Sequence, residues 1–319
     1  MIERLANLDA VCSATASRTE GGWRALDLRA WDGIDARLLP DRGLDCFGAW
    51  YRGVPLAWVS AVGERGPLDG RLRDDDWLRG FGGGLVATCG LRNVGAASEG
   101  HGLHGEISHQ PARDVRLARW VDGEQAIVSA SATVTEVSAL GHRLELERTW
   151  TTRTGTGHLE LVDVTRNLGR EPEAAPVLYH VNLGAPLWSP SATLSLQARA
   201  TTPRDGDAVE PWDRALEPLA GARERVFEHD VAPGEDGWCV AAVDSPATGL
   251  RLLLRWEAAS LPRFHQWVHP APGIAVLGLE PANCSVLGRA ADRAAGRLPV
   301  LEPGEERVTR LEVRVAARG

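Results

Sequence analysis

The sequence contains no lysine, because all 35 basic residues in its 319 positions are arginine. A Schiff-base mechanism needs an amine side chain, so this absence excludes aldolase-type chemistry that passes through a lysine imine. The formal net charge is −8 and the acids are interspersed among the arginines. A run of basic residues that could follow a phosphate backbone is therefore missing, and we expect no nucleic-acid binding. Any catalysis must depend on histidines and carboxylates.

Paired cysteines and long apolar runs are also missing. Five cysteines are scattered along the chain without a CxxC pair, namely Cys12, Cys46, Cys89, Cys239 and Cys284. An odd number without paired spacing argues against a secreted disulfide framework. The N-terminal segment has acids and no long apolar core, and no uncharged apolar run reaches about 18 residues. We therefore expect a cytoplasmic protein that is neither exported nor inserted into a membrane.

Alternation of apolar and polar residues predicts the fold class. The apolar fraction is 44% and the charged fraction 24%, which is the usual balance of a globular protein with a sizeable core. In residues 125–184 inward-type and polar residues alternate with a period of two. For example, Leu144, Leu146, Arg148 and Trp150 alternate with polar residues. Turn signals divide the rest into short segments. We predict an all-β, mainly antiparallel, large β-sandwich that forms one domain over residues 1–319, with its core at about 25–315.

Glycines are concentrated in residues 81–112, around an apolar strand-like run from Leu85 to Leu91. This density suits a backbone that approaches a ligand closely. A phosphate-binding loop is the rival interpretation, but GxxxxGK[ST] is absent and no helix-like run follows. Just upstream, Arg42 and Asp45 lie in turn-like text and are interpreted as solvated turn charges.

Three short motifs carry the residues most suited to proton transfer. They are Gly102-Leu103-His104-Gly105, Tyr179-His180-Val181-Asn182-Leu183-Gly184 and Leu277-Gly278-Leu279-Glu280-Pro281. In the last two, a histidine and a carboxylate are expected at the ends of apolar strands. Asn182 is expected on the same face as His180. Two imidazoles and a carboxylate can perform acid–base chemistry without a cofactor.

The three motifs, in this order, resemble the aldose 1-epimerase (galactose mutarotase) superfamily, over roughly residues 25–315. The resemblance implies the super-sandwich fold of that superfamily and a cofactor-independent mutarotase or epimerase acting on a monosaccharide or modified monosaccharide. It implies that Glu280 is the general base at the anomeric hydroxyl and that His180 protonates the ring oxygen. It also implies that His104 and Arg92 contact the sugar. Ring opening removes one proton while delivering another, which is why such a pair is needed.

Further substrate contacts are predicted in Phe264-His265-Gln266-Trp267, where an aromatic plate and an amide suit the faces of a sugar ring. His265, Gln266 and Trp267 are therefore candidate binding residues, although a tryptophan is commonly part of a core. The superfamily also has a substrate-binding acid between the histidine and the glutamate. Asp205 and Asp207 are candidates, but no motif fixes the position, so this role is unassigned.

Other interpretations stay open. His180 could be a core histidine with satisfied hydrogen bonds and Arg92 a surface residue. Metal ligation by His101, His104 and His109, or by His265 and His269, is disfavoured because the spacing matches no common site, so we predict no metal. The function could instead be non-catalytic carbohydrate binding, or that of a related sugar or sugar-phosphate epimerase or isomerase. The sequence does not name the sugar, and it fits a monomer or a homodimer.

Overall fold

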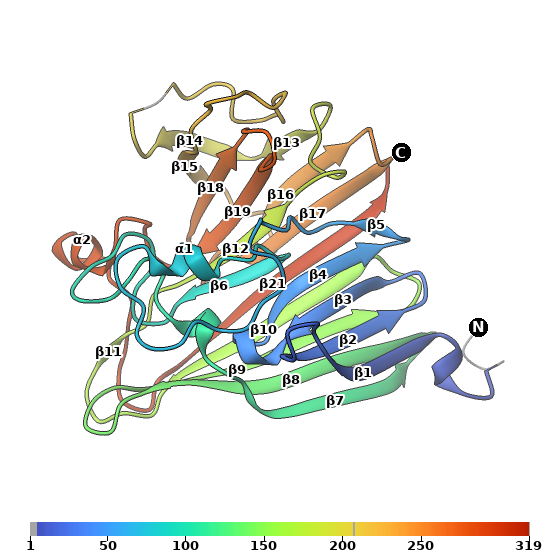
Figure 1. Ribbon diagram of the computed structural model, residues 1–319, viewed down its shortest axis with the longest axis horizontal. Coiled ribbons are helices and arrows are strands. Elements are labelled where there is room, and N and C mark those ends of the chain that lie inside the picture. The colour runs from blue at the N-terminus through green and yellow to red at the C-terminus, as the bar shows by residue number, and fades with distance from the viewer. Residues whose placement is uncertain (1–4, 207, 319) are drawn as a thin grey trace.

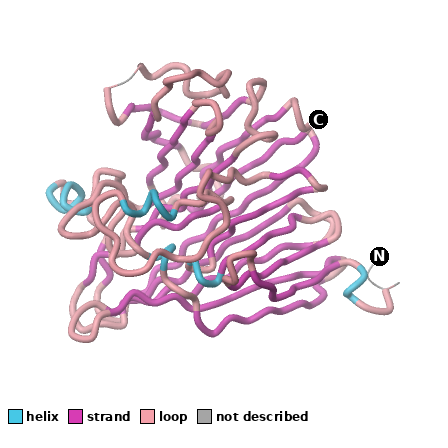
Figure 2. The backbone as a smooth tube through the Cα atoms, viewed as in Figure 1, coloured by secondary structure: helices cyan, strands magenta, loops and turns pink. Residues whose placement is uncertain are grey.

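The computed structural model describes residues 5–206 and 208–318. Within them the chain forms two large antiparallel sheets and one small one (Figures 1 and 2). The first has eleven strands, with β1-β2-β3-β4-β6-β12-β19-β18-β15-β14 in order and β5 beside β4. The second, of eight strands, runs β13-β16-β17-β21-β10-β9-β8-β7, and β11 pairs with β20. The predicted all-β, mainly antiparallel sandwich is confirmed.

The bounds of the elements are as follows. The first sheet contains β1 (Cys12–Arg18), β2 (Arg24–Ala30), β3 (Ile34–Leu39), β4 (Asp45–Tyr51), β5 (Val54–Pro55), β6 (Val86–Gly90), β12 (Val177–Leu183), β14 (Ala198–Pro203), β15 (Arg225–Val231), β18 (Arg263–His269) and β19 (Val276–Ala282). The second contains β7 (Arg113–Asp122), β8 (Gln125–Val137), β9 (Arg143–Arg153), β10 (His158–Asn167), β13 (Thr193–Leu196), β16 (Trp238–Ser245), β17 (Leu250–Glu257) and β21 (Glu306–Ala317). The remaining elements are β11 (Glu173–Ala174), β20 (Val300–Leu301), α1 (Asp76–Gly80), α2 (Arg289–Ala294) and the 3₁₀ turns Leu8–Ala10, Pro40–Arg42 and Ile107–His109.

The main core lies between the two large sheets. It takes Leu38, Val181 and Leu279 from the first sheet and Val128 and Leu252 from the second, among many others. The alternation in β8, β9 and β10 places every second residue in this core, which is the reason the sequence pattern was informative there. Among the described residues, no helix is long and apolar enough to cross a membrane.

A second apolar cluster covers the outer face of the first sheet. Trp77 and Phe81, from α1 and the residue after it, pack with Leu178 of β12 and Ala282 of β19. In Figure 1 α1 and its flanking loops lie across the middle of this sheet. Strands β12 and β19 are consequently buried on both faces, with every residue shielded. This arrangement creates an enclosed space on the outer face.

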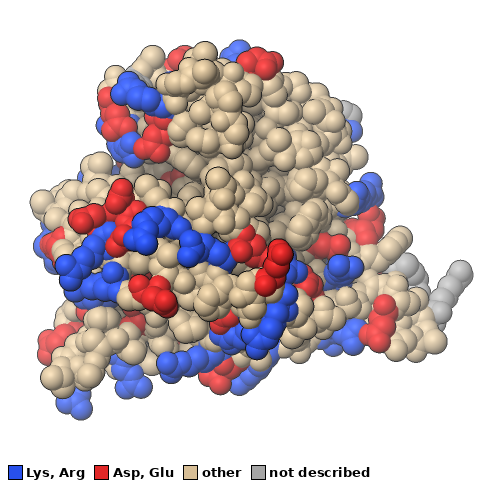
Figure 3. Space-filling view, in the orientation of Figure 1, with Lys and Arg blue, Asp and Glu red and all other residues tan. Residues whose placement is uncertain are grey.

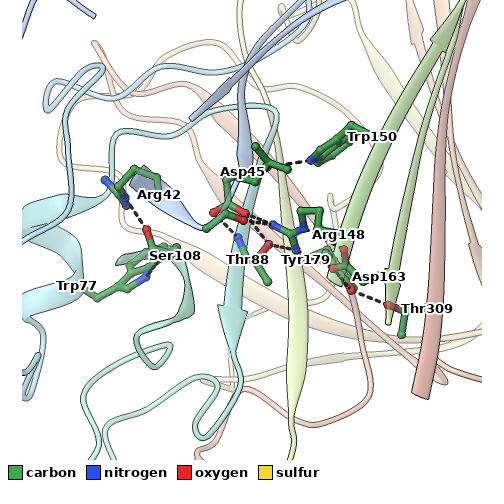
Figure 4. A network of polar contacts seen from close by, with 12 residues as sticks. Arg42, Asp45, Trp77, Thr88, Ser108, Arg148, Trp150, Asp163, Tyr179 and Thr309 are labelled. Atoms are coloured by element: carbon green, nitrogen blue, oxygen red, sulfur yellow. Dashed lines mark hydrogen bonds and ion pairs between the residues drawn. The ribbon is translucent and has the colours of Figure 1, made fainter. Parts of the chain in front are cut away.

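A buried polar network crosses the main core (Figure 4). The Arg148 guanidinium donates to both carboxylate oxygens of Asp163 at 2.9 and 2.7 Å and to Asp45 at 2.6 Å. Thr88 Oγ1 and the Tyr179 hydroxyl complete the partners of these carboxylates. The prediction that Asp45 is a solvated turn charge is wrong, because its partners come from strands that are distant in the sequence.

Arg42 is also buried, so the turn-charge prediction is wrong for this residue too. Its Nε donates to the backbone oxygen of Ser108 and its Nη1 donates to that of Gly80 at 2.9 Å. Exposed charges lie elsewhere: Figure 3 shows arginines and acids interspersed, mostly over the lower half of that face. All five cysteines are buried and unpaired, as predicted.

Candidate active site

Strand β12 sends alternate side chains to the two faces of the first sheet. Tyr179 points into the main core, where it joins the polar network, and His180 therefore points to the outer face. The antiparallel register pairs Val181 with Leu279 and Asn182 with Gly278, which brings His180 beside Glu280 of β19. The expectation that both groups lie at strand ends is corrected, since each lies within its strand.

His180 and Glu280 form a close buried pair. His180 Nε2 lies 3.2 Å from Glu280 Oε1, and the two residues are only 5% and 3% exposed. The contact lacks the alignment of a hydrogen bond, so Glu280 Oε1 has no hydrogen-bond partner among the described residues. His180 Nδ1, the other ring nitrogen, also has none there. Burial raises the pKa of Glu280 to about 8, although Arg204 opposes the rise. Burial also lowers the pKa of His180 to about 4. Between these values the pair holds one proton.

The pair lies in a cavity of about 330 Å³ on the outer face of the first sheet. Its walls combine aromatic and aliphatic side chains with five polar ones. The lining residues are Trp77, Leu78, Phe81, Gly95, Ala96, Leu103, His104, His180, Arg204, Glu224, Val226, Trp267, Glu280, Val286 and Leu287. A concave, mainly apolar cavity with a few convergent polar groups is the usual form of a small-molecule site.

His104 joins the pair from the glycine-rich loop. Its ring centroid is 5.9 Å from that of His180, and its backbone has φ of 58°, in the left-handed region. The backbone N–H of Gly95 donates to His104 Nδ1 at 3.3 Å, so the proton of the neutral ring is on Nε2. Burial, with a smaller effect of His180, lowers the pKa of His104 to about 3. His104 is thus a neutral donor at the cavity wall.

Trp267 also lines the cavity, with its ring centroid 5.3 Å from that of His180. Gly278, its neighbour across the strand pair, keeps the floor open, since a Cβ there would lie 2.9 Å from Glu280 Oε1. Asn182 is placed differently. Its amide donates to the backbone oxygens of Gly84 and His180, so it holds the strand and loop rather than the cavity.

The other predicted binding residues lie outside the cavity. His265 is fully buried, with Nε2 3.1 Å from the backbone oxygen of Cys284. Gln266 points to the opposite face, where it contacts His229 at 2.8 Å. Arg92 faces Glu173 and borders a separate polar cavity. The alternation of side chains along a strand explains the direction of Gln266. Its two neighbours, His265 and Trp267, point to the outer face, so Gln266 points to the inner face. We therefore leave these three residues out of the proposed site.

Sequence reasoning missed an ion pair at the cavity rim. Arg204 Nη2 lies 3.1 Å from Glu224 Oε1, and the other carboxylate oxygen of Glu224 accepts from Trp267 Nε1 at 2.9 Å. Asp205, a candidate for the substrate-binding acid, is bound by Arg204, while Asp207 lies outside the described residues. Residues 200–236 are rich in proline, glycine and charge, a composition typical of a long loop, but the end of β14 and all of β15 lie in this region. The apolar pair Val226-Phe227 between polar residues is only a weak signal for a strand, because residues 225–231 do not alternate.

A metal centre is not apparent in the part of the chain that the structure describes. Among residues 5–206 and 208–318, no group of three or more His, Cys, Asp or Glu side chains is arranged to hold a metal ion. His101 instead contacts Arg289, and His109 contacts Arg42 and the backbone of Leu68. These contacts engage two of the three imidazoles of the first candidate set.

Comparison with solved structures identifies the class of fold. The chain is similar to a provisionally assigned aldose 1-epimerase from Klebsiella pneumoniae subsp. pneumoniae, with a TM-score of 0.87 and 21% identity over 95% of this chain and 83% of that one. The chain is also similar to a galactose mutarotase-like protein from Clostridium acetobutylicum, with a TM-score of 0.66 and 12% identity over 97% of this chain and 100% of that one. For the GalM/aldose epimerase homologue from C. elegans, the TM-score is 0.55 and the identity 14%, over 97% of this chain and 100% of that one. The fold is therefore the galactose mutarotase-like β-sandwich that the sequence motifs led us to expect.

A family model places the chain more narrowly. Residues 20–315 match the model described as "Domain of unknown function (DUF4432)", and the protein belongs to this family. The comparison with curated proteins finds no match. The solved structures are below 25% identity, so they establish the fold and leave the reaction to be argued from the site.

Proposed function

We propose that the protein is a cofactor-independent sugar mutarotase or related epimerase that interconverts the anomers of a monosaccharide by acid–base catalysis. The observation that carries the proposal is the 3.2 Å approach of His180 Nε2 to Glu280 Oε1 at the cavity floor. Both groups are buried, and each keeps a polar atom that has no hydrogen-bond partner within residues 5–206 and 208–318. A buried polar group in that state is costly unless a ligand completes its bonding.

Anomer exchange requires one proton to leave the anomeric hydroxyl and one to reach the ring oxygen. In the proposed reaction Glu280 is the base and His180 the acid. The proton of the pair must then reside on His180 when the sugar binds. Burial favours the opposite arrangement, with the proton on Glu280, whereas the positive charge of Arg204 favours ionised Glu280. After rotation about the C1–C2 bond the two groups, with reversed roles, close the ring as the other anomer.

The cavity walls are suited to hold the ring during this exchange. His104 Nε2–H is a donor for a sugar oxygen, and the aromatic rings of Trp77, Phe81 and Trp267 offer apolar surfaces. We propose that these residues bind the substrate, and that the chain acts as one mutarotase-like domain. A hydrophobic cluster with side chains from both large sheets supports the latter.

The test is anomer exchange measured by saturation-transfer NMR across a panel of aldoses, ketoses and uronates. We expect exchange faster than in buffer for at least one sugar, and the activity should persist in EDTA. Sugar binding detected by calorimetry, with exchange no faster than in buffer for every sugar, would support a carbohydrate-binding protein instead. Loss in EDTA with recovery on adding metal would indicate a metal-dependent isomerase.

A further inference from the structure

Most hydrogen-bonding groups of the cavity wall are already engaged within the protein. The backbone N–H of Gly95 donates to His104 Nδ1, and its carbonyl accepts from the His104 N–H. The Ala96 N–H donates to the Val286 carbonyl, and the Ala96 carbonyl accepts from the Asn93 amide. The loop that encloses the sugar site therefore presents backbone atoms whose partners are fixed before a ligand enters.

The polar side chains at the wall and rim are engaged as well. The indole N–H of Trp77 donates to Ser108 Oγ at 3.2 Å, and that of Trp267 donates to Glu224. Arg204 binds both Glu224 and Asp205. A sugar hydroxyl would have to displace these contacts in order to use the indole N–H groups. Glu224 differs, because its carboxylate accepts one hydrogen bond at each oxygen and can accept more, but its side chain is 48% exposed and lies at the rim.

On the enclosed side of the cavity, away from the rim, three groups of the described residues remain ready for a ligand, namely His180, Glu280 and His104 Nε2–H. In the proposed reaction the first two serve the anomeric hydroxyl and the ring oxygen. His104 can then serve one further oxygen. An ordinary hexose carries more hydroxyl groups than these partners can satisfy, and only those directed to the open side of the cavity can bind water.

Apart from the aromatic rings of Trp77, Phe81 and Trp267, the rest of the surface is aliphatic. Leu103, Val226 and Val286 line the wall, while Leu78 and Leu287 line the cavity and are 51% and 50% exposed, which places them at its mouth. A methyl or methylene group of a ligand gains from contact with such residues. A hydroxyl in the same place would lose its water without a replacement, and an apolar pocket disfavours such an added hydroxyl by up to about 10²-fold.

We propose that the substrate is a deoxy sugar, with hydrogen or a methyl group where a common aldose carries a hydroxyl on the enclosed side. This inference rests on the proposed function and adds the substrate class. The shortage of free partners and the aliphatic wall both favour a ligand with fewer hydroxyl groups. Because the two arguments use different atoms, they are independent.

The experiment compares matched sugars that differ by one hydroxyl. Exchange would be measured by saturation-transfer NMR for D-galactose against 6-deoxy-D-galactose, L-mannose against L-rhamnose, and D-glucose against 2-deoxy-D-glucose. We expect kcat/KM for the deoxy member to exceed that of its parent by about 10-fold or more in at least one pair. Equal or faster exchange of the parent in all three pairs would overturn the substrate class and leave the mutarotase proposal standing. Exchange of no sugar above the buffer rate would instead contradict the proposed function itself.

Two variants of one wall residue test the physical reason. Val286→Thr keeps the shape of the side chain and adds a hydroxyl, whereas Val286→Ala only removes apolar surface. We expect Thr to reduce the preference for the deoxy member of the best pair by about 3-fold or more, measured as the ratio of kcat/KM values, and Ala to reduce it less. An equal reduction by both variants would show that missing hydrogen-bond partners are not the cause.

Discussion

Two buried polar sites lie on opposite faces of β12, one residue apart. Tyr179 belongs to the network around Arg148, in which both carboxylates are bound by a guanidinium and by hydroxyl groups. His180 belongs to a pair in which Glu280 Oε1 and the imidazole Nδ1 have no hydrogen-bond partner in the part of the chain that the structure describes. The residues of both sites are buried, with His180 5% and Glu280 3% exposed and Arg148 and Asp163 0%. The difference is that the first has its bonding complete and can only stabilise, whereas the second has capacity left for a ligand.

The largest expected effect is on activity in the incomplete site. Glu280→Gln keeps the shape of the side chain but cannot accept the anomeric proton, so anomer exchange should fall by roughly 10²–10⁴. Sugar affinity, measured by calorimetry, should change little. Glu136→Gln is the matched control, because Glu136 is also a buried carboxylate but lies outside the cavity. An equal loss in both variants would contradict the specific role of Glu280.

The complete site should respond in stability instead. Arg148→Met leaves Asp163 and Asp45 buried without their cation, and we expect a loss of about 3–5 kcal/mol in the free energy of unfolding. Urea unfolding followed by tryptophan fluorescence measures this loss. If the variant does not fold, Thr309→Val, which removes only one partner of the Tyr179 hydroxyl, should cost about 1 kcal/mol. No measurable loss in either variant would mean that the network contributes nothing to stability.

The pH dependence of exchange should reflect the single proton of the pair. Below about pH 4 both groups hold a proton and no base is left, and above about pH 8 both have lost it and no acid is left. The expected profile is a plateau between these limits that falls about tenfold per pH unit on either side. Stopped-flow polarimetry can record it wherever circular dichroism shows the protein to be folded. A rate that is independent of pH from 3 to 10 would rule out this pair as the acid and base.

A smaller effect should appear in stability at the same site. The pKa of Glu280 is about 8 in the folded protein against 4.5 ordinarily, so the folded state holds the proton more tightly. The contribution of Glu280 protonation to the stability of the folded state is complete below pH 4.5 and is lost as the pH rises to 8. Glu280→Gln avoids this loss, so it should gain at least about 1 kcal/mol of stability relative to the wild type between pH 4.5 and pH 8.5, since one pKa unit corresponds to about 1.4 kcal/mol. The comparison needs urea unfolding at both pH values, and an unchanged difference would place the Glu280 pKa near its ordinary value.

Much of the fold was predictable because its strands have one face in the main core. The alternation of apolar and polar residues in β8, β9 and β10 follows from that burial. Arg148, an arginine at a position where the pattern has apolar residues, was a sequence sign of the buried network. The prediction of a solvated Asp45 was wrong because its partner, Arg148, lies on β9, 103 residues further along the chain. A charged side chain in a turn-like sequence is normally exposed to solvent. It is buried only when strands from distant parts of the chain pair around it.

The site was predictable only where motifs mark it. His104, His180 and Glu280 line one cavity, as their motif order suggested. Arg204 and Glu224 were missed, because their ion pair depends on how β14 lies beside β15. Gln266 was selected by chemical type, but its direction depends on strand register, which is fixed by pairing in three dimensions.

The most direct test of the central idea, that His180 and Glu280 act as one acid–base unit, is the exchange rate of the double variant. Saturation-transfer NMR would compare His180→Asn, Glu280→Gln and the two combined, at pH 7 and equal sugar saturation. Ring opening fails once either proton transfer fails, so the double variant should be about as slow as the slower single variant. If the two losses instead multiply, so that each group contributes independently to the rate, the shared-proton mechanism is contradicted.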